Sequence, residues 1–339
     1  MNGHTSIPSR QFQPASLQLN DLKQICSRTV DTSTYPLACA VERNIPIYDL
    51  GALETGAIIS QLQDEWHHVL HTGPGVFVLR DMYNPARYSH NSFNKHGAED
   101  PASFVDYYAN LWLAAVCTAW LGPGYKVTAQ VNAVHPGGAA QGAHRDFHLG
   151  FQEADACARF PAPTQLATQF LTLQGAVAHT DMPVENGPTR QDGVFFNPAL
   201  FHAAGANVMD PNNGGFRRVA NLLQVSSPFG KPMETVDSLP LVENTWELLV
   251  QRYQTAGKHI ADPDLDPQRS SLEAREIRAF IQAVAEGYPF PTNLDRRPPA
   301  PSGMAPESEQ AIVLRGLEAG WSRKEVVAAL EKLRHDERA

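Results

Sequence analysis

Three residues of the chain have the types and the order of a metal centre. His144 and Asp146 lie two positions apart in the run 142–148, Gly-Ala-His-Arg-Asp-Phe-His, and His202 follows downstream in the run 201–205, Phe-His-Ala-Ala-Gly. Side chains at positions i and i+2 of a strand point to the same face, so His144 and Asp146 can reach one point in space. Two histidines and one carboxylate form a facial triad, the usual cage for non-haem Fe(II). The spacing therefore predicts an iron centre that binds oxygen.

An iron centre of this type needs a co-substrate anchor as well as ligands. Three protein ligands leave three of six octahedral positions open, two for a 2-oxo acid and one for O₂. An arginine holds the far carboxylate of 2-oxoglutarate best, because its planar fork binds both oxygens and stays charged when buried. Arg217 and Arg218 lie on a predicted strand after His202. Strand alternation points only one of them inward.

Apolar periodicity predicts the helices and strands that would position these residues. Ser322 with Glu325 three residues later has the pattern of a capping box at the start of the last helix. The predicted helices are 19–28, 54–71, 102–120, 241–256, 271–286, 307–319 and 322–335, and the predicted strands are 45–50, 73–80, 125–134, 167–178, 194–197 and 216–226.

Several separate stretches of the chain, taken together, resemble one enzyme family, the phytanoyl-CoA dioxygenase family of Fe(II)/2-oxoglutarate-dependent oxygenases. Each stretch is common alone, and their combination in this order is specific. The resemblance covers about 73–227. The stretches are 141–148 (Gln-Gly-Ala-His-Arg-Asp-Phe-His), 181–189 (Asp-Met-Pro-Val-Glu-Asn-Gly-Pro-Thr), 202–207 (His-Ala-Ala-Gly-Ala-Asn) and 215–217 (Gly-Phe-Arg).

The resemblance implies a fold and a function. The fold would be mainly β with surrounding helices, a double-stranded β-helix of the jelly-roll or cupin-like kind. The enzyme would be a non-haem Fe(II)/2-oxoglutarate-dependent dioxygenase, an oxidoreductase that hydroxylates or desaturates a small organic substrate and releases succinate and CO₂. Because Asp146 is retained, the resemblance favours these reactions over halogenation, which needs that coordination position vacated.

The resemblance also assigns roles to individual residues. His144, Asp146 and His202 would bind the iron and form the catalytic centre. Arg217 would hold the 2-oxoglutarate tail, with Arg218 outward and solvated. Hydrogen bonds to the co-substrate would come from two further residues, Gln141 and Thr189.

One departure from the family pattern concerns the wall of the site. Family members usually carry a further strand-and-loop segment between the Asn-Gly-Pro-Thr turn and the strand before the second histidine. Here Thr189-Arg190 runs almost directly into Gln191. Either one strand of the jelly roll is absent, or the chain is a splice or gene-model variant. Loss of a strand would expose the edges of its neighbours and open the pocket.

Composition divides the chain and limits its partners. We expect a flexible N-terminal arm over 1–45, the oxygenase domain over 46–290, a Pro-rich linker over 291–306 and a helical C-terminal extension over 307–339. The net charge is −9 without a basic block, which argues against nucleic acid, and no apolar run approaches the roughly 18 residues of a membrane span. The polar N-terminus and four scattered cysteines favour a cytoplasmic location. The expected partner is a small-molecule substrate, and the oligomeric state stays unknown.

Other histidines are weaker candidates for chemistry. His67 and His71 lie four apart and can share a helix face, but a zinc site there would need further ligands. His148 is predicted to line the pocket or to be structural, and His135 and His179 to be loop or core residues.

Two alternative functions stay open beside the oxygenase. The chain could be a catalytically impaired jelly-roll binding or scaffold protein that keeps the ligand residues. It could also be a cupin-like metalloenzyme that does not use 2-oxoglutarate.

Overall fold

A computed structural model provides the structure of the protein. It describes residues 7, 9–12, 18–53, 58–84, 93–182, 190–210, 212, 215–257, 260, 269–301 and 303–338.

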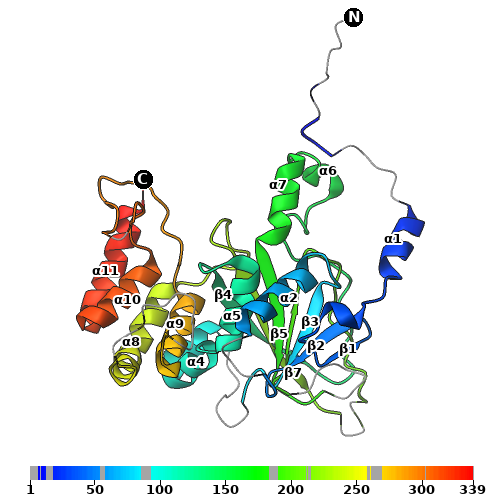
Figure 1. Ribbon diagram of the computed structural model, residues 1–339, viewed down its shortest axis with the longest axis horizontal. Coiled ribbons are helices and arrows are strands. Elements are labelled where there is room, and N and C mark those ends of the chain that lie inside the picture. The colour runs from blue at the N-terminus through cyan, green and yellow to red at the C-terminus, as the bar shows by residue number, and fades with distance from the viewer. Residues whose placement is uncertain are drawn as a thin grey trace, which may run out of the picture.

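A seven-stranded mixed sheet forms the centre of the molecule, in the order β1-β2-β3-β6-β5-β7-β4 (Figure 1). Only β2 and β3 run parallel to each other, and the other neighbours are antiparallel. Five of the six predicted strands lie within or close to their predicted bounds, and β5 starts later than predicted. The strands are β1 (Ala40–Glu42), β2 (Ile45–Asp49), β3 (Val76–Arg80), β4 (Lys126–Val134), β5 (Thr172–Ala178), β6 (Gly193–Phe196) and β7 (Arg218–Ser226).

Helices cover one face of this sheet and extend beyond its β4 edge (Figure 1). Trp66 of α2 is fully buried and stacks on Phe77 of β3, and Phe77 in turn stacks on Phe195 of β6. The helices are α1 (Leu19–Cys26), α2 (Ile59–His71), α3 (Phe93–Glu99), α4 (Pro101–Tyr108), α5 (Leu111–Leu121), α6 (Ala154–Cys157), α7 (Ala162–Ala167), α8 (Ser238–Thr255), α9 (Leu272–Val284), α10 (Glu309–Ala319) and α11 (Arg323–Asp336), with short 3-10 turns at Thr32–Thr34 and Thr168–Phe170. Among the described residues, no helix has the length and apolarity to span a membrane.

Strand alternation gives the sheet two different faces. On β7, Leu223 and Val225 point into the apolar core under the helices. Ala220 and Gln224, of the opposite parity, line a cavity on the other face, and this is the face that carries the candidate metal centre.

The fold class predicted from the sequence, a jelly-roll core with surrounding helices, is confirmed in its larger sheet. A full jelly roll has eight strands in two sheets. Here β4, β7, β5 and β6 form one sheet, while the opposite sheet is reduced, within the described chain, to one antiparallel bridge between His144 and His202. The chain passes from β5 to its neighbour β6 through 179–192, of which 183–189 lie outside the described residues. The predicted shortening at Arg190–Gln191 falls at the edge of the undescribed residues and stays a prediction.

The long helix predicted over 102–120 is two helices, α4 and α5. The break falls at Asn110, whose side chain accepts a hydrogen bond from the Leu113 backbone N–H at 2.9 Å and donates one to the Met82 carbonyl at 2.9 Å. An asparagine at the N-cap satisfies a backbone donor that the helix leaves unpaired, so a new helix starts there. The strand predicted over 167–178 begins only at Thr172, because α7 and a 3-10 turn occupy the residues before it.

The C-terminal helices pack against α8 (Figure 1). Leu317 of α10 and Leu330 of α11 share the main apolar core with Trp246, whose indole N–H donates to the Trp321 carbonyl at 3.0 Å. The capping box predicted at the start of α11 is present.

A polar cluster fixes α11 to α8 and α10. Arg334 donates to Asp237 and to the Ser238 hydroxyl, both at 2.7 Å, and to Glu309 at 3.2 Å. The Glu309 side chain is only 8% exposed, so its charge depends on this partner. The hydrogen bonds raise the pKa of Arg334 against the desolvation that would lower it.

Removing the Arg334 side chain should therefore loosen this corner. We expect Arg334→Ala to lower the free energy of unfolding by about 2 kcal/mol, less than for a fully buried pair because Arg334 is partly exposed. The exposed Arg323→Ala is the control in the same helix and should change stability little. Equal urea midpoints for the two variants would contradict the role of the cluster.

Candidate metal centre

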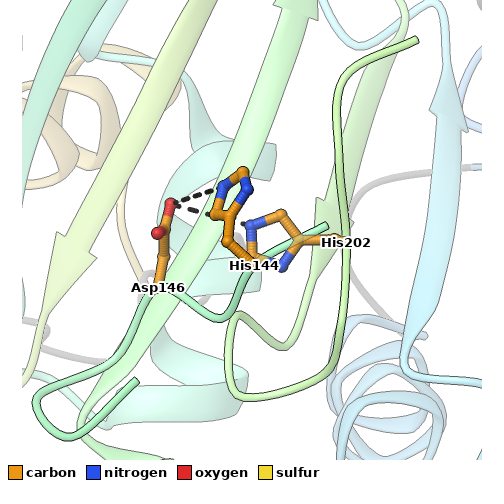
Figure 2. A group of neighbouring side chains, drawn as sticks. All are labelled: His144, Asp146 and His202. Atoms are coloured by element: carbon orange, nitrogen blue, oxygen red, sulfur yellow. Dashed lines mark ion pairs between the residues drawn. The ribbon is translucent and has the colours of Figure 1, made fainter. Parts of the chain in front are cut away.

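The backbone brings the two halves of the predicted triad together. His144 and His202 form an antiparallel bridge in which each N–H donates to the other residue's carbonyl at 3.0 Å. The Asp146 N–H donates to the Pro198 carbonyl at 2.9 Å. The three side chains consequently converge on one point (Figure 2).

The donor atoms of the triad have the spacing of a metal cage. Oδ2 of Asp146 lies 3.5 Å from Nε2 of His144 and 3.6 Å from Nε2 of His202. One ligand atom from each residue lies within 4.8 Å of the others. Among the described residues, this is the one group of three or more histidine, cysteine or carboxylate side chains that could hold a metal ion. The prediction that His144, Asp146 and His202 lie together therefore agrees with the structure.

The second nitrogen of each imidazole fixes which atom faces the site. Nδ1 of His144 lies 2.7 Å from the Gly142 carbonyl, and Nδ1 of His202 lies 2.9 Å from the Leu200 carbonyl. A carbonyl only accepts, so Nδ1 carries the proton and Nε2 keeps its lone pair for a metal. Nε2 of His202 is buried and makes no hydrogen bond. An orphaned acceptor of this kind, beside a second imidazole and a carboxylate, fits Fe(II).

Gln174 of β5 holds the carboxylate ligand in place. Its Nε2 donates to Oδ2 of Asp146 at 2.7 Å and also lies 2.7 Å from Oε1 of Gln224 on β7. The two glutamines are register partners on adjacent strands. Sequence reasoning missed both residues, although a lone glutamine on the inward face of an apolar strand was the available signal.

Arg145, between the two ligands of the His-x-Asp pair, fixes the segment that carries His202. Its Nε donates to the Ala199 carbonyl at 2.5 Å, and its guanidinium lies over the rings of Phe147 and Phe201. Burial lowers the pKa of Arg145 from its usual value.

A cavity of about 810 Å³ opens beside the triad. Its wall is mainly apolar and includes Val76, Phe196 and Leu222 from three strands. Gln141, predicted as a co-substrate contact, lines it too, and its Oε1 accepts from the Ala204 N–H at 3.0 Å. Thr189, the other predicted contact, lies outside the described residues.

The structure places the two neighbouring arginines differently from the prediction. Arg218, the first residue of β7, lines the cavity, whereas Arg217 precedes the strand and is exposed. The reason is register: Arg218 pairs with Val134 and shares parity with Ala220 and Gln224, the inward residues of β7. The hydrogen bond from Nη2 of Arg218 to the Gly205 carbonyl, at 2.7 Å, holds the guanidinium near the segment of His202.

Three further histidines that the sequence singles out have structural surroundings. Nε2 of His148 lies 2.6 Å from the Lys231 carbonyl. The rings of His67 and His71 lie 5.6 Å apart, and each packs on an aromatic side chain, Trp120 and Phe170 respectively.

Comparison with protein families supports the resemblance predicted from the sequence. The family model described as phytanoyl-CoA dioxygenase matches residues 57–191. The match confirms the predicted resemblance to this family over the matched residues. The matched segment contains Gln141, His144 and Asp146 and ends before His202, so it starts and stops earlier than the resemblance predicted from the motifs.

None of the curated proteins compared with the chain matches it. Among solved structures, the chain is similar to a non-haem monooxygenase, the ThoJ–Ni complex, at 17% identity and a TM-score of 0.30, covering 42% of this chain and 60% of that one. It is also similar to the α-ketoglutarate-dependent epimerase SnoN from nogalamycin biosynthesis (14%, 0.30, 60% and 88%) and to EctD from S. alaskensis with bound Fe (13%, 0.29, 54% and 75%). Likenesses of this size support neither a substrate nor a reaction for this chain.

Gln174→Leu should weaken the metal site without removing a ligand. Losing the hydrogen bond to Asp146 frees the carboxylate to rotate, and outer-shell changes of this kind weaken metal binding about 10- to 100-fold. Anaerobic titration with Fe(II) measures the dissociation constant. Gln251→Leu on α8, far from the site, is the control. Identical Fe(II) affinity in the two variants would show that Gln174 does not position Asp146.

Proposed function

We propose that this protein is an Fe(II)- and 2-oxoglutarate-dependent dioxygenase that hydroxylates or desaturates a small organic substrate, with release of succinate and CO₂. The observation that carries the proposal is the convergence of two Nε2 atoms and one carboxylate oxygen at the edge of an apolar cavity. Fe(II) with 2-oxoglutarate supplies the oxidising chemistry when bound, while the protein binds, orients and shields the reactants.

The first task of the protein is to hold the ligands rigidly. The carbonyls of Gly142 and Leu200 fix the two imidazoles, and Gln174 fixes Asp146. Every ligand thus has a second partner that sets its orientation before metal arrives, which lowers the cost of binding.

The second task is to hold the co-substrate. We assign the far carboxylate of 2-oxoglutarate to Arg218, because its guanidinium lies in the cavity and Arg217 is exposed. Gln141 would contribute its amide nitrogen, since its Oε1 already accepts from Ala204. Thr189 stays a proposed contact by resemblance alone.

A second candidate function is favoured by the open rim of the cavity. Phe201 is 74% exposed and Leu200 is 47% exposed, and both line the cavity on the side of the reduced sheet. A binding or scaffold protein that keeps the ligand residues would tolerate this opening, whereas an oxygenase needs its substrate to cover it. Succinate formation from 2-oxoglutarate separates the two candidates. The partner predicted from the sequence, a small molecule, and the cytoplasmic location stay predictions.

A complex of Fe(II) and 2-oxoglutarate in this site should be detectable by absorption spectroscopy. Under anaerobic conditions, Fe(II) and 2-oxoglutarate together should give a weak visible charge-transfer band in the wild type, and His144→Ala should abolish it. His148→Ala is the matched control, because its ring contacts the Lys231 carbonyl and not the triad. If the wild-type protein shows neither the band nor bound metal, the proposed dioxygenase function is contradicted.

The two neighbouring arginines provide a paired test of co-substrate binding. Arg218→Ala should raise the dissociation constant of 2-oxoglutarate about 100-fold, since two charge-assisted hydrogen bonds of about 1.5 kcal/mol each would be lost. Arg217→Ala should change it little, because that side chain is exposed. If Arg217→Ala raised the dissociation constant of 2-oxoglutarate more than Arg218→Ala did, Arg217 would be the anchor, as the sequence predicts. Unchanged turnover in both variants would favour a cupin-like enzyme that does not use 2-oxoglutarate.

A further inference from the structure

A row of side chains crosses the sheet from the metal centre to the far wall of the cavity. Phe196, Gln174, Gln224 and Thr128 are register partners on β6, β5, β7 and β4. At one end of this row Phe196 packs on the ligand His202, and Gln174 beside it donates to the ligand Asp146. Neighbouring strands lie about 4.8 Å apart, so Thr128 is about 10 Å from Gln174 across two strand spacings.

Glu234 caps the far end of the row. Its Oε2 accepts from the Thr128 hydroxyl at 2.8 Å, and its Oε1 accepts from Nε2 of Gln130 at 2.5 Å. Two of about four acceptor positions on the carboxylate are therefore used. Glu234 also lines the cavity that holds the triad. No lysine or arginine of the described residues pairs with it, although other half-buried acids in this chain, such as Asp106, have such a partner.

Gln224, between Glu234 and the metal centre, has an amide N–H donor that makes no hydrogen bond within the described residues. Its Oε1 is occupied by Gln174, while its Nε2 is buried and has no hydrogen-bond partner among the described residues. An unpaired buried N–H costs about 1–3 kcal/mol, which an acceptor on a bound molecule would offset. Gln224 lines the cavity, so a molecule bound there lies beside this amide.

The charges of the cavity point to the kind of ligand. This step rests on the proposed function. Fe(II) and Arg218 carry three positive charges, and 2-oxoglutarate and Asp146 carry three negative ones, so these groups cancel. The carboxylate of Glu234 is then left without a counter-charge, and a half-buried charge in an apolar cavity favours a partner of opposite sign.

We propose that Glu234 binds an ammonium group of the substrate and that Gln224 binds a hydroxyl or carbonyl oxygen nearer the iron. The substrate class is then an aliphatic amine, with its oxidised carbon over the triad and its ammonium about 10 Å away along the row. The apolar wall, including Val194 and Leu222, contacts the carbon chain between the two ends.

Three probes of equal chain length test this assignment: hexylamine, hexan-1-ol and hexanoate, each titrated calorimetrically at pH 7 into the wild-type protein with and without Fe(II) and 2-oxoglutarate. We expect hexylamine to bind at least 10-fold more tightly than either of the others. Glu234→Gln, which keeps the shape of the side chain, should remove most of that preference. Glu243→Gln, an exposed glutamate on α8, is the matched control and should keep it.

Equal affinity for the three probes in the wild type would overturn the assignment, and this comparison needs no variant to fold. An amine preference that survives Glu234→Gln would overturn it as well. The charge-transfer band is recorded on the same samples. If the wild type shows no band but still prefers the amine, the proposed function is contradicted and the amine subsite is supported. An intact band without amine preference would support the proposed function and contradict the amine subsite.

Discussion

Two backbone hydrogen bonds between His144 and His202 are the constraint on which the site depends. They join the segment after β4 to the segment after β6, which are far apart in sequence, and they bring both imidazoles to one side of the large sheet. The Asp146 N–H extends the same pairing to Pro198. In a full jelly roll, a second sheet would support these segments from both sides. Here the pairing itself, with Arg145 donating to the Ala199 carbonyl, keeps the ligands in place.

The large sheet provides the polar side chains that support the metal centre from one side. Its inward face presents Gln174, Gln224 and Arg218, each fixed by strand register, to a site whose ligands come from loops. One face of the sheet buries an apolar core under the helices, so a slip of one residue would turn these polar side chains into that core. The packing that stabilises the sheet therefore also positions the chemistry. The cavity stays open to solvent at Leu200 and Phe201, whose side chains are exposed.

The ligands could be predicted from the sequence because their types and spacing are local signals. His144 and Asp146 are two residues apart, and His202 stands in a recognisable run. Arg217 and Arg218 could not be separated, because the parity of an inward residue depends on where β7 starts, and element boundaries are the least certain part of such predictions. The contact between Gln174 and Gln224 could not be predicted for a related reason, although the inward position of each glutamine could. Their contact exists only through the pairing of β5 with β7, which no local pattern specifies.

The most direct measurement is a crystal structure of the anaerobic complex with Fe(II) and 2-oxoglutarate. We expect iron bonded to Nε2 of His144, Nε2 of His202 and one Asp146 oxygen, with the far carboxylate of 2-oxoglutarate on Arg218. Iron bound elsewhere, or 2-oxoglutarate absent from a cavity that holds the metal, would contradict it.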